Sequence, residues 1–217
     1  MNIKKSLLVQ ASMLVLGLLY SLYMNQQLPD RVPTHWNINN QPDAWGPKST
    51  VLYLGLAILL LGPLMTVAIP KLSPKNFGGE TFGETFATVM LLVQGMFLAI
   101  HLVILRSAGG GMDNIGNVMM AVIFAFFAFF GNLMGRIKRN FYMGVRTPWT
   151  LASERVWLAT HRRAGRLWFF GGIGGVLFSL LPIPMYVPIA ALVLMSLAPV
   201  VDSYLLSRRL EPDEAPQ

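Results

Sequence analysis

Polar side chains that could do chemistry gather in one segment of an otherwise apolar chain, residues 131–165, GNLMGRIKRNFYMGVRTPWTLASERVWLATHRRAG. Arg146, Glu154 and His161 supply a cation, a carboxylate and an imidazole, which together could bind an anionic group or handle a proton. The spacing assigns no Ser nucleophile to a neighbouring base. The chain also has no cysteine, which excludes thiolate nucleophiles and disulfides. A lone His161 is more typical of a packed histidine than of a catalyst, so we predict no catalytic residue and no enzyme.

Thr147 and Pro148 predict the start of a helix in this segment, because the hydroxyl can cap free N–H groups and proline suits the first helical position. We expect this helix to run to about Ala164 and to join the apolar run that follows. It would arrange its residues in two neighbouring stripes: Glu154, Trp157, His161 and Gly165 in one, and Arg155, Leu158, Arg162 and Arg166 in the other.

Two interpretations of this helix are open. It could lie in the inner membrane interface as a short amphipathic helix, with Trp157 toward lipid and the arginines toward phosphates. Alternatively, it could form a docking face in which Arg146, Glu154 and His161 make a fixed polar network.

A second polar segment, residues 26–49, contains LPDRVPTHWNINNQPDAWGPK. Pro29 and Pro33 exclude a regular helix, and Val32–Asn37 predicts a short strand. Asn39, Asn40 and the pair Pro42-Asp43 predict a turn. Two tryptophans, Trp36 and Trp45, either sit at the level of lipid headgroups or form a surface for a partner.

A metal site is conceivable outside the membrane, with His35, His101 and the carboxylates Asp30, Asp43 and Asp113 as its ligands. No short spacing between ligands supports it, so we predict neither a metal nor another cofactor.

The composition of the chain predicts which kind of element positions these residues. Of 217 residues, 54% are hydrophobic and 12% are charged, far fewer charges than the roughly 25% of soluble domains. The net charge of +7 does not indicate nucleic acid, because the basic residues cluster at the ends of apolar runs, as in membrane proteins. We therefore predict an all-α, polytopic membrane helix bundle in contact with lipid.

Six apolar runs are long enough to cross about 30 Å of hydrocarbon. They are Ser6–Asn25, Thr50–Ile69, Phe82–Leu105, Ile115–Gly135, Arg166–Leu181 and Met185–Leu206. The first lacks a small-residue cleavage site before Tyr20, so we interpret it as a retained span rather than a signal peptide. The fifth and sixth runs could alternatively form one re-entrant hairpin.

The distribution of Lys and Arg predicts the orientation. With the amino terminus inside, 14 of the 17 basic residues lie on the inner side, including Lys75, and only Arg31, Lys48 and Arg106 lie outside. Both termini should therefore be cytoplasmic. We predict a two-helix unit over residues 1–70 and a four-helix unit over 71–217, with a long cytoplasmic loop at 136–165.

Residues within the spans have simple structural interpretations. Gly171 and Gly175 are typical of a close contact between helices, because the run around them lacks the strand and the Lys-Ser/Thr of a phosphate loop. Glu84 and Asp202 lie near the inner ends of spans, where acidic groups are candidates for function. Asp202 could simply pair with Arg166.

Two of these segments resemble a known family. NFYMGVRTPWTLASERVW, followed by Thr160-His161 and Gly165, resembles the carboxy-terminal signature of the SdpI family of bacterial immunity membrane proteins. LPDRVPTHWNINNQPDAWGPK resembles the amino-terminal domain of unknown function that accompanies it. Two residues depart from the pattern: Asn40 stands where glycine is usual, which a turn tolerates, and Arg139 stands where proline often precedes Asn140.

The resemblance implies a multi-pass protein of the bacterial cytoplasmic (inner) membrane. It also implies protection of a cell against a toxin or antimicrobial peptide, and binding of a cytoplasmic repressor or other protein. The inner functional residues that it implies are Asn132, Asn140, Gly144, Arg146, Thr147, Pro148, Trp149, Glu154, Trp157, Thr160 and His161. The outer ones are Pro33, His35, Trp36, Asn37, Pro42 and Asp43. The alternatives are a small transporter or membrane enzyme, with His161 and Glu154 or His35 and Asp43 handling protons, and a structural membrane subunit.

Overall fold

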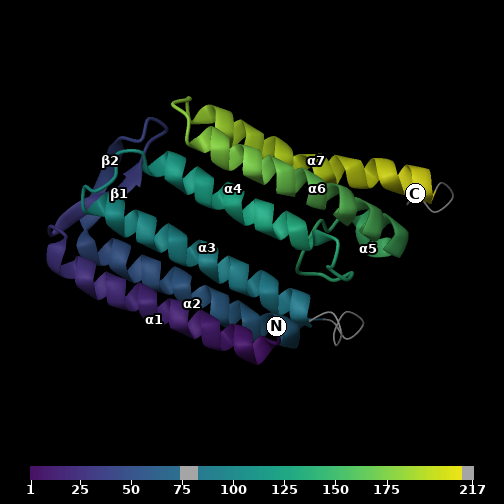
Figure 1. The fold of residues 1–217 in the computed structure, drawn as a ribbon, viewed down its shortest axis with the longest axis horizontal. Coiled ribbons are helices and arrows are strands. Elements are labelled where there is room, and N and C mark those ends of the chain that lie inside the picture. Colours follow the sequence, from purple (N-terminus) through teal and green to yellow (C-terminus); the bar gives the residue numbers. More distant parts are fainter. Residues whose placement is uncertain (74–82, 212–217) are drawn as a thin grey trace.

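The computed structural model describes residues 1–73 and 83–211. Its elements are α1 (Ile3–Gln27), β1 (Arg31–Trp36), β2 (Pro42–Pro47), α2 (Lys48–Leu72), α3 (Glu84–Ala108), α4 (Ile115–Met134), α5 (Pro148–Ala152), α6 (Glu154–Ser179) and α7 (Tyr186–Leu210). Six long helices lie alongside one another, with the β1–β2 hairpin at one end of the bundle and both chain ends at the other (Figure 1). The predicted helical bundle is confirmed.

Among the described residues, five helices are long and apolar enough to cross a membrane: α1, α2, α3, α4 and α7. They correspond to five of the six predicted spans, although the predicted start of the third, Phe82, lies outside the described residues, as does Lys75. The fifth predicted run, Arg166–Leu181, forms the second half of α6. That helix is not among the five, since Arg162, Arg163 and Arg166 fall within its last 18 residues.

The helix predicted from Thr147 to about Ala164 is interrupted at Ser153, whereas its predicted continuation into the following apolar run is confirmed. The helix that begins at Pro148 ends at Ala152, and Ser153 is extended with φ −119° and ψ 126°. The Ser153 hydroxyl accepts a hydrogen bond from the Val156 N–H and thereby caps a new helix. This helix, α6, then continues unbroken for 26 residues to Ser179.

The outer segment folds as an antiparallel hairpin in which Arg31 pairs with Pro47 and Trp36 with Pro42. The predicted strand at Val32–Asn37 is confirmed to within one residue. The prediction that Pro42-Asp43 belongs to the turn is wrong, because both residues begin β2. The hairpin is anchored by Val32, which is fully buried against the ends of the first three helices.

Candidate functional site

The inner site is positioned by a close approach of α4 and α6. A Cβ atom at Gly172 would lie 2.5 Å from the backbone nitrogen of Ala128, and one at Gly131 would lie 2.6 Å from that of Phe169. The predicted close packing of this glycine-rich helix is therefore confirmed, but the backbone contacts occur at these positions. Gly171 and Gly175 instead face side chains, those of Met195 and Phe124. The loop of residues 135–147 follows α4 and leads through α5 into α6.

Asn140 shapes that loop from its centre and is fully buried. Its Oδ1 accepts hydrogen bonds from the backbone N–H groups of Tyr142 and Met143, both at 2.7 Å. Its Nδ2 donates to the carbonyl oxygens of Lys138, at 2.8 Å, and Met143, at 3.3 Å. One amide side chain thus satisfies four backbone groups, and another residue could not replace this set of donors and acceptors.

Gly144, Trp157 and His161 form a layered contact between the loop and α6. Gly144 has φ +95°, and a Cβ atom there would clash with His161 Nε2. The His161 ring stacks on Trp157 at a centroid distance of 3.9 Å, and Trp157 Nε1 donates to the Ile137 carbonyl oxygen at 2.8 Å. The prediction that Trp157 faces lipid is wrong, because its side chain is completely buried beneath the loop.

His161 uses both ring nitrogens for backbone contacts. Nδ1 donates to the Trp157 carbonyl oxygen at 2.8 Å, and Nε2 accepts from the Val145 N–H at 3.2 Å, which defines the neutral Nδ1–H tautomer. Burial lowers the pKa of His161 to about 4, against the opposing effect of the Trp157 carbonyl. Neutral at physiological pH and with no free nitrogen, this imidazole holds the loop on the helix.

Thr147 and Thr150 connect the loop to α7. The two residues form a reciprocal capping box at the start of α5, with Pro148 at the first helical position, as predicted from Thr147 and Pro148. Thr147 Oγ1 also contacts Ser203 Oγ at 3.1 Å, and the Trp149 ring packs against Tyr204 at 5.1 Å. The loop is therefore fixed to both α6 and α7.

The predicted network of Arg146, Glu154 and His161 is not formed. Arg146 is exposed and donates to the Phe141 carbonyl oxygen at 2.6 Å, and Glu154 Oε2 lies 3.4 Å from Arg139 Nε. Arg139, which departs from the family pattern, also donates to the carbonyl oxygens of Leu151 and Ala152 at 3.0 Å. It thereby supplies the connection between the loop entry and α5.

Three further predictions concern residues around α6. Asn132 is exposed in a groove between α4 and α6, away from the Asn140 layer. Thr160 is fully buried, and its hydroxyl has no hydrogen-bond partner within the described residues. The predicted pair of Asp202 with Arg166 is wrong, because Asp202 Oδ1 lies 2.8 Å from Arg163 Nη1, one turn earlier on α6.

The outer residues meet on the hairpin. His35 Nδ1 and Asp43 Oδ1 form a hydrogen-bonded pair across the strands, and both side chains are exposed. A groove of about 470 Å³ is lined by the buried Pro33, by Trp36 and Pro42, and by the α3–α4 connection. Trp45 also lines this groove and is 54% exposed. The groove thus brings together three of the predicted outer residues, whereas His35, Asn37 and Asp43 do not line it.

The turn of the hairpin is connected to the start of α4. Asn37 Oδ1 accepts from the backbone N–H groups of Asn39 and Gln41 at 2.9 and 3.1 Å. Asn40 has φ +61°, which confirms that asparagine takes the left-handed position in which the family has glycine. Its amide contacts Asn117 Oδ1 and the Gly116 N–H, at 3.0 and 2.6 Å, at the start of α4.

The conceivable metal site does not form in the described part of the chain, which brings together no group of three metal-ligating side chains. His101 is buried between α1, α2 and α3, where its Nε2 lies 2.7 Å from Ser21 Oγ. It is therefore separated from the exposed His35.

Sequence reasoning missed a row of buried polar side chains in the first three helices. Gln10 donates to Ser6 at 2.9 Å and accepts from Thr66 at 3.1 Å, and Gln94 is fully buried with both amide atoms unpaired within the described residues. Single amides inside the apolar runs of residues 6–25 and 82–105 were the signal in the sequence.

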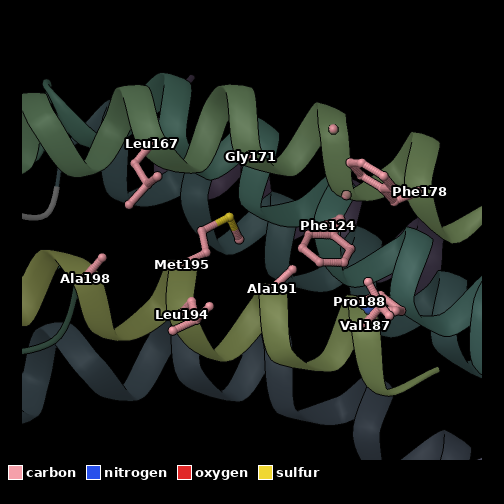
Figure 2. Close-up of a pocket in the computed structure, with 12 residues that line it drawn as sticks. Phe124, Leu167, Gly171, Phe178, Val187, Pro188, Ala191, Leu194, Met195 and Ala198 are labelled. Carbon is pink, nitrogen blue, oxygen red and sulfur yellow. The ribbon is translucent and has the colours of Figure 1, made fainter. Parts of the chain in front are cut away.

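An apolar cavity of about 560 Å³ separates parts of α6 and α7 (Figure 2). Phe178, Val187 and Pro188 lie at one end, Leu167 and Ala198 lie at the other, and Phe124 reaches in from α4. Trp168 Nε1 donates to the Met195 carbonyl oxygen at 2.9 Å and joins the two helices beside the cavity. No polar side chain lines this space, so it is suited to apolar groups alone.

Comparisons with known proteins support the resemblance. Residues 136–203 match the SdpI/YfhL protein family, and residues 13–61 match a domain of unknown function, DUF1648. The chain is 25% identical over 167 residues to the immunity protein SdpI of Bacillus subtilis (strain 168), covering 75% of this chain and 76% of that protein. No solved structure matches. The predicted resemblance is confirmed, and the chain is a multi-pass bacterial membrane protein.

Proposed function

We propose that this chain, which carries the SdpI/YfhL family segment at residues 136–203, is a membrane immunity and signalling protein. In this proposal it protects a bacterium against a membrane-active toxin or antimicrobial peptide and binds a cytoplasmic regulator. One observation carries the proposal: the signature residues fold the loop of residues 135–147 onto α6 and α7, and this folded loop is the inner platform. Asn140, Gly144, Trp157 and His161 are all used to fold the loop, and Arg146 and Trp149 remain on its surface.

The platform has the properties of a protein-binding surface. Arg146 presents an exposed guanidinium, and Trp149 is only partly covered by Tyr204. Arginine and tryptophan are the residue types that contribute most energy at protein interfaces. The fixed backbone beneath them lowers the entropy lost when a partner binds.

We propose six spans, with the second half of α6, from Arg166, as the fifth in chain order, and both termini in the cytoplasm. The support is that α6 lies beside α4 and α7 along the bundle, and that both chain ends lie at the end opposite the hairpin (Figure 1). The chain has no cysteine, so single cysteines can be introduced at Ala44 and at Arg155 and labelled with an impermeant reagent in intact cells. Labelling at position 44 alone is expected; labelling at position 155 would reverse the orientation.

A continuous series of contacts could couple the hairpin at one end of the bundle to the inner platform at the other. The hairpin contacts the start of α4 through Asn40, and Asn117 donates to the Ser179 carbonyl oxygen of α6 at 3.2 Å. Both helices lead to the inner platform. An outer ligand would shift the platform by no more than its difference in affinity for the two arrangements. A fluorophore at position 155 should change its emission when a peptide that is proven to bind saturates the protein, and a constant emission would exclude coupling.

The direct test is survival of a sensitive bacterium that expresses the chain during challenge with a panel of membrane-active peptides. We expect protection against at least one peptide, and a loss of at least tenfold in survival with His35→Ala or Arg146→Ala at equal membrane levels. Arg209→Ala is the matched control for loss of one exposed arginine. Absence of protection against every peptide would reject the immunity function.

A second candidate function is transport, which the buried polar side chains of α1–α3 favour. Gln94 and His101 lie seven residues apart on one face of α3, and each has a buried atom unpaired in the described structure. Polar groups inside a span often mark a substrate or ion path. Uptake of ions or peptide by liposomes containing the purified chain, abolished by Gln94→Leu, would favour transport over binding.

A further inference from the structure

A groove of about 580 Å³ lies between α4 and α6 and borders the inner platform at His161. The close contact between Gly131 and Gly165 forms its floor. Asn132, Arg162 and Arg166 line one part, and Phe169 and Phe170 line the other. The groove therefore joins a cationic region to an apolar one.

The two arginines of the groove have no acidic partner. Arg162 and Arg166 lie one turn apart on α6, and neither makes an ion pair within the described residues, whereas Arg163 on the same helix pairs with Asp202. The Asn132 side chain is also exposed and forms no hydrogen bond within the described chain. Two guanidinium groups and one amide thus converge on a space that holds no counter-charge.

The position of the groove along the predicted span indicates which kind of ligand it binds. α4 is one of the five candidate spans and ends at Met134, so Asn132 lies within its last turn, at the boundary of the apolar layer. Phe170 is 67% exposed, lines the groove, and follows the two arginines along α6 in the direction of the apolar run. A soluble anion would leave this apolar wall without a partner.

We propose that the groove binds one anionic phospholipid, with the phosphate against Arg162 and Arg166 and an acyl chain along Phe169 and Phe170. Guanidinium groups bind phosphate oxygens through paired, charge-assisted hydrogen bonds. Asn132 donates a further hydrogen bond to the headgroup. This inference does not depend on the immunity function, because the lipid is a resident of the membrane rather than a toxin or a regulator.

The proposal is tested by native mass spectrometry of the purified full chain, titrated with phosphatidylglycerol in detergent. The double variant Arg162→Gln/Arg166→Gln should bind the lipid at least tenfold more weakly. Arg155→Gln/Arg208→Gln is the matched control, because it removes the same charge from two exposed arginines outside the groove and should retain binding. Equal weakening in both variants would overturn a specific site and leave only general attraction to basic charge.

Asn132→Asp gives an independent test that keeps the side chain almost the same size. Its carboxylate repels the lipid phosphate, so we expect weaker binding with unchanged thermal unfolding. Unchanged binding would overturn the assigned position of the headgroup. Competition with glycerol 3-phosphate, which has no acyl chain, should not displace the lipid at millimolar concentration; displacement would identify a site for soluble phosphate instead. Dioleoylglycerol, which lacks phosphate, should not bind.

Discussion

The contact between Gly144 and His161 makes a quantitative prediction about Gly144→Ala. The new Cβ would overlap His161 Nε2, and the residue would have to keep φ +95°. Left-handed backbone costs a residue with a Cβ about 1–2 kcal/mol, and overpacking in a rigid site costs about 1–3 kcal/mol. Displacement of the ring would also remove the acceptor of the buried Val145 N–H. We expect the free energy of unfolding to fall by about 3–5 kcal/mol.

The assay is reversible unfolding of the purified chain in mixed micelles, followed by circular dichroism across a titration with sodium dodecyl sulfate. Gly135→Ala is the matched control, because Gly135 has an ordinary φ of −67° and a Cβ there would meet no atom within 4 Å. Its effect should stay within about 0.5 kcal/mol.

A double-mutant cycle with His161→Ala separates the two causes. Without the ring, Gly144→Ala should cost only the backbone strain of about 1–2 kcal/mol, which leaves a coupling energy of about 2 kcal/mol between the positions. An equal cost in both backgrounds would refute the steric argument. A cost below about 1 kcal/mol in the native background would refute the whole arrangement of the loop.

Three further predictions concern the same framework. As pH falls from 6.5 toward 4, the unfolded state protonates His161 before the folded state does, so stability should decline by about 3 kcal/mol in total, and His161→Gln should lose this slope in pH-dependent unfolding. Gly172→Ala should lower the unfolding free energy by about 1–3 kcal/mol because a Cβ would meet the α4 backbone, whereas Gly174→Ala, with open space, should be neutral in the same titration. Asn40→Gly should lose only the side-chain hydrogen bonds to α4, about 1 kcal/mol, whereas Asn40→Ala should lose about 1–2 kcal/mol more through its positive φ; equal values would contradict the turn geometry.

The spans and the hairpin turn could be predicted because each depends on local signals. Continuous apolar sequence identifies helices such as α2 and α4 without knowledge of their neighbours. The left-handed position of Asn40 likewise follows from the tolerance of asparagine for that backbone. The second strand, β2, was missed, since Pro42 and Asp43 are individually typical of turns and become a strand only through pairing with β1.

The sequence was enough to predict where the inner site lies, but not how its side chains are arranged. Periodicity grouped Trp157 and His161 on one stripe of a helix, which is correct, but lipid and a folded loop are both apolar neighbours for such a stripe. The neighbour is the loop and not lipid because Asn140 folds the preceding loop over the two rings. The partner of Asp202 depends on how α6 and α7 are rotated about their axes, and spacing within either helix does not contain that information.

The cavity beside α7 makes the two halves of that helix unequal. Asp202, Ser203 and Tyr204 contact α6 or the platform, and Ser153 donates to Glu211 just beyond the helix, whereas the half near Val187 borders empty apolar space. Helix α7 is thus fixed mainly at its carboxy-terminal half. Its backbone amides should exchange hydrogen faster over residues 186–194 than over residues 200–207, since local opening is easiest where fewest contacts are lost. A membrane component that filled the cavity would therefore reduce the difference in amide exchange between the two halves of α7. It could do so without changing the average position of the helix.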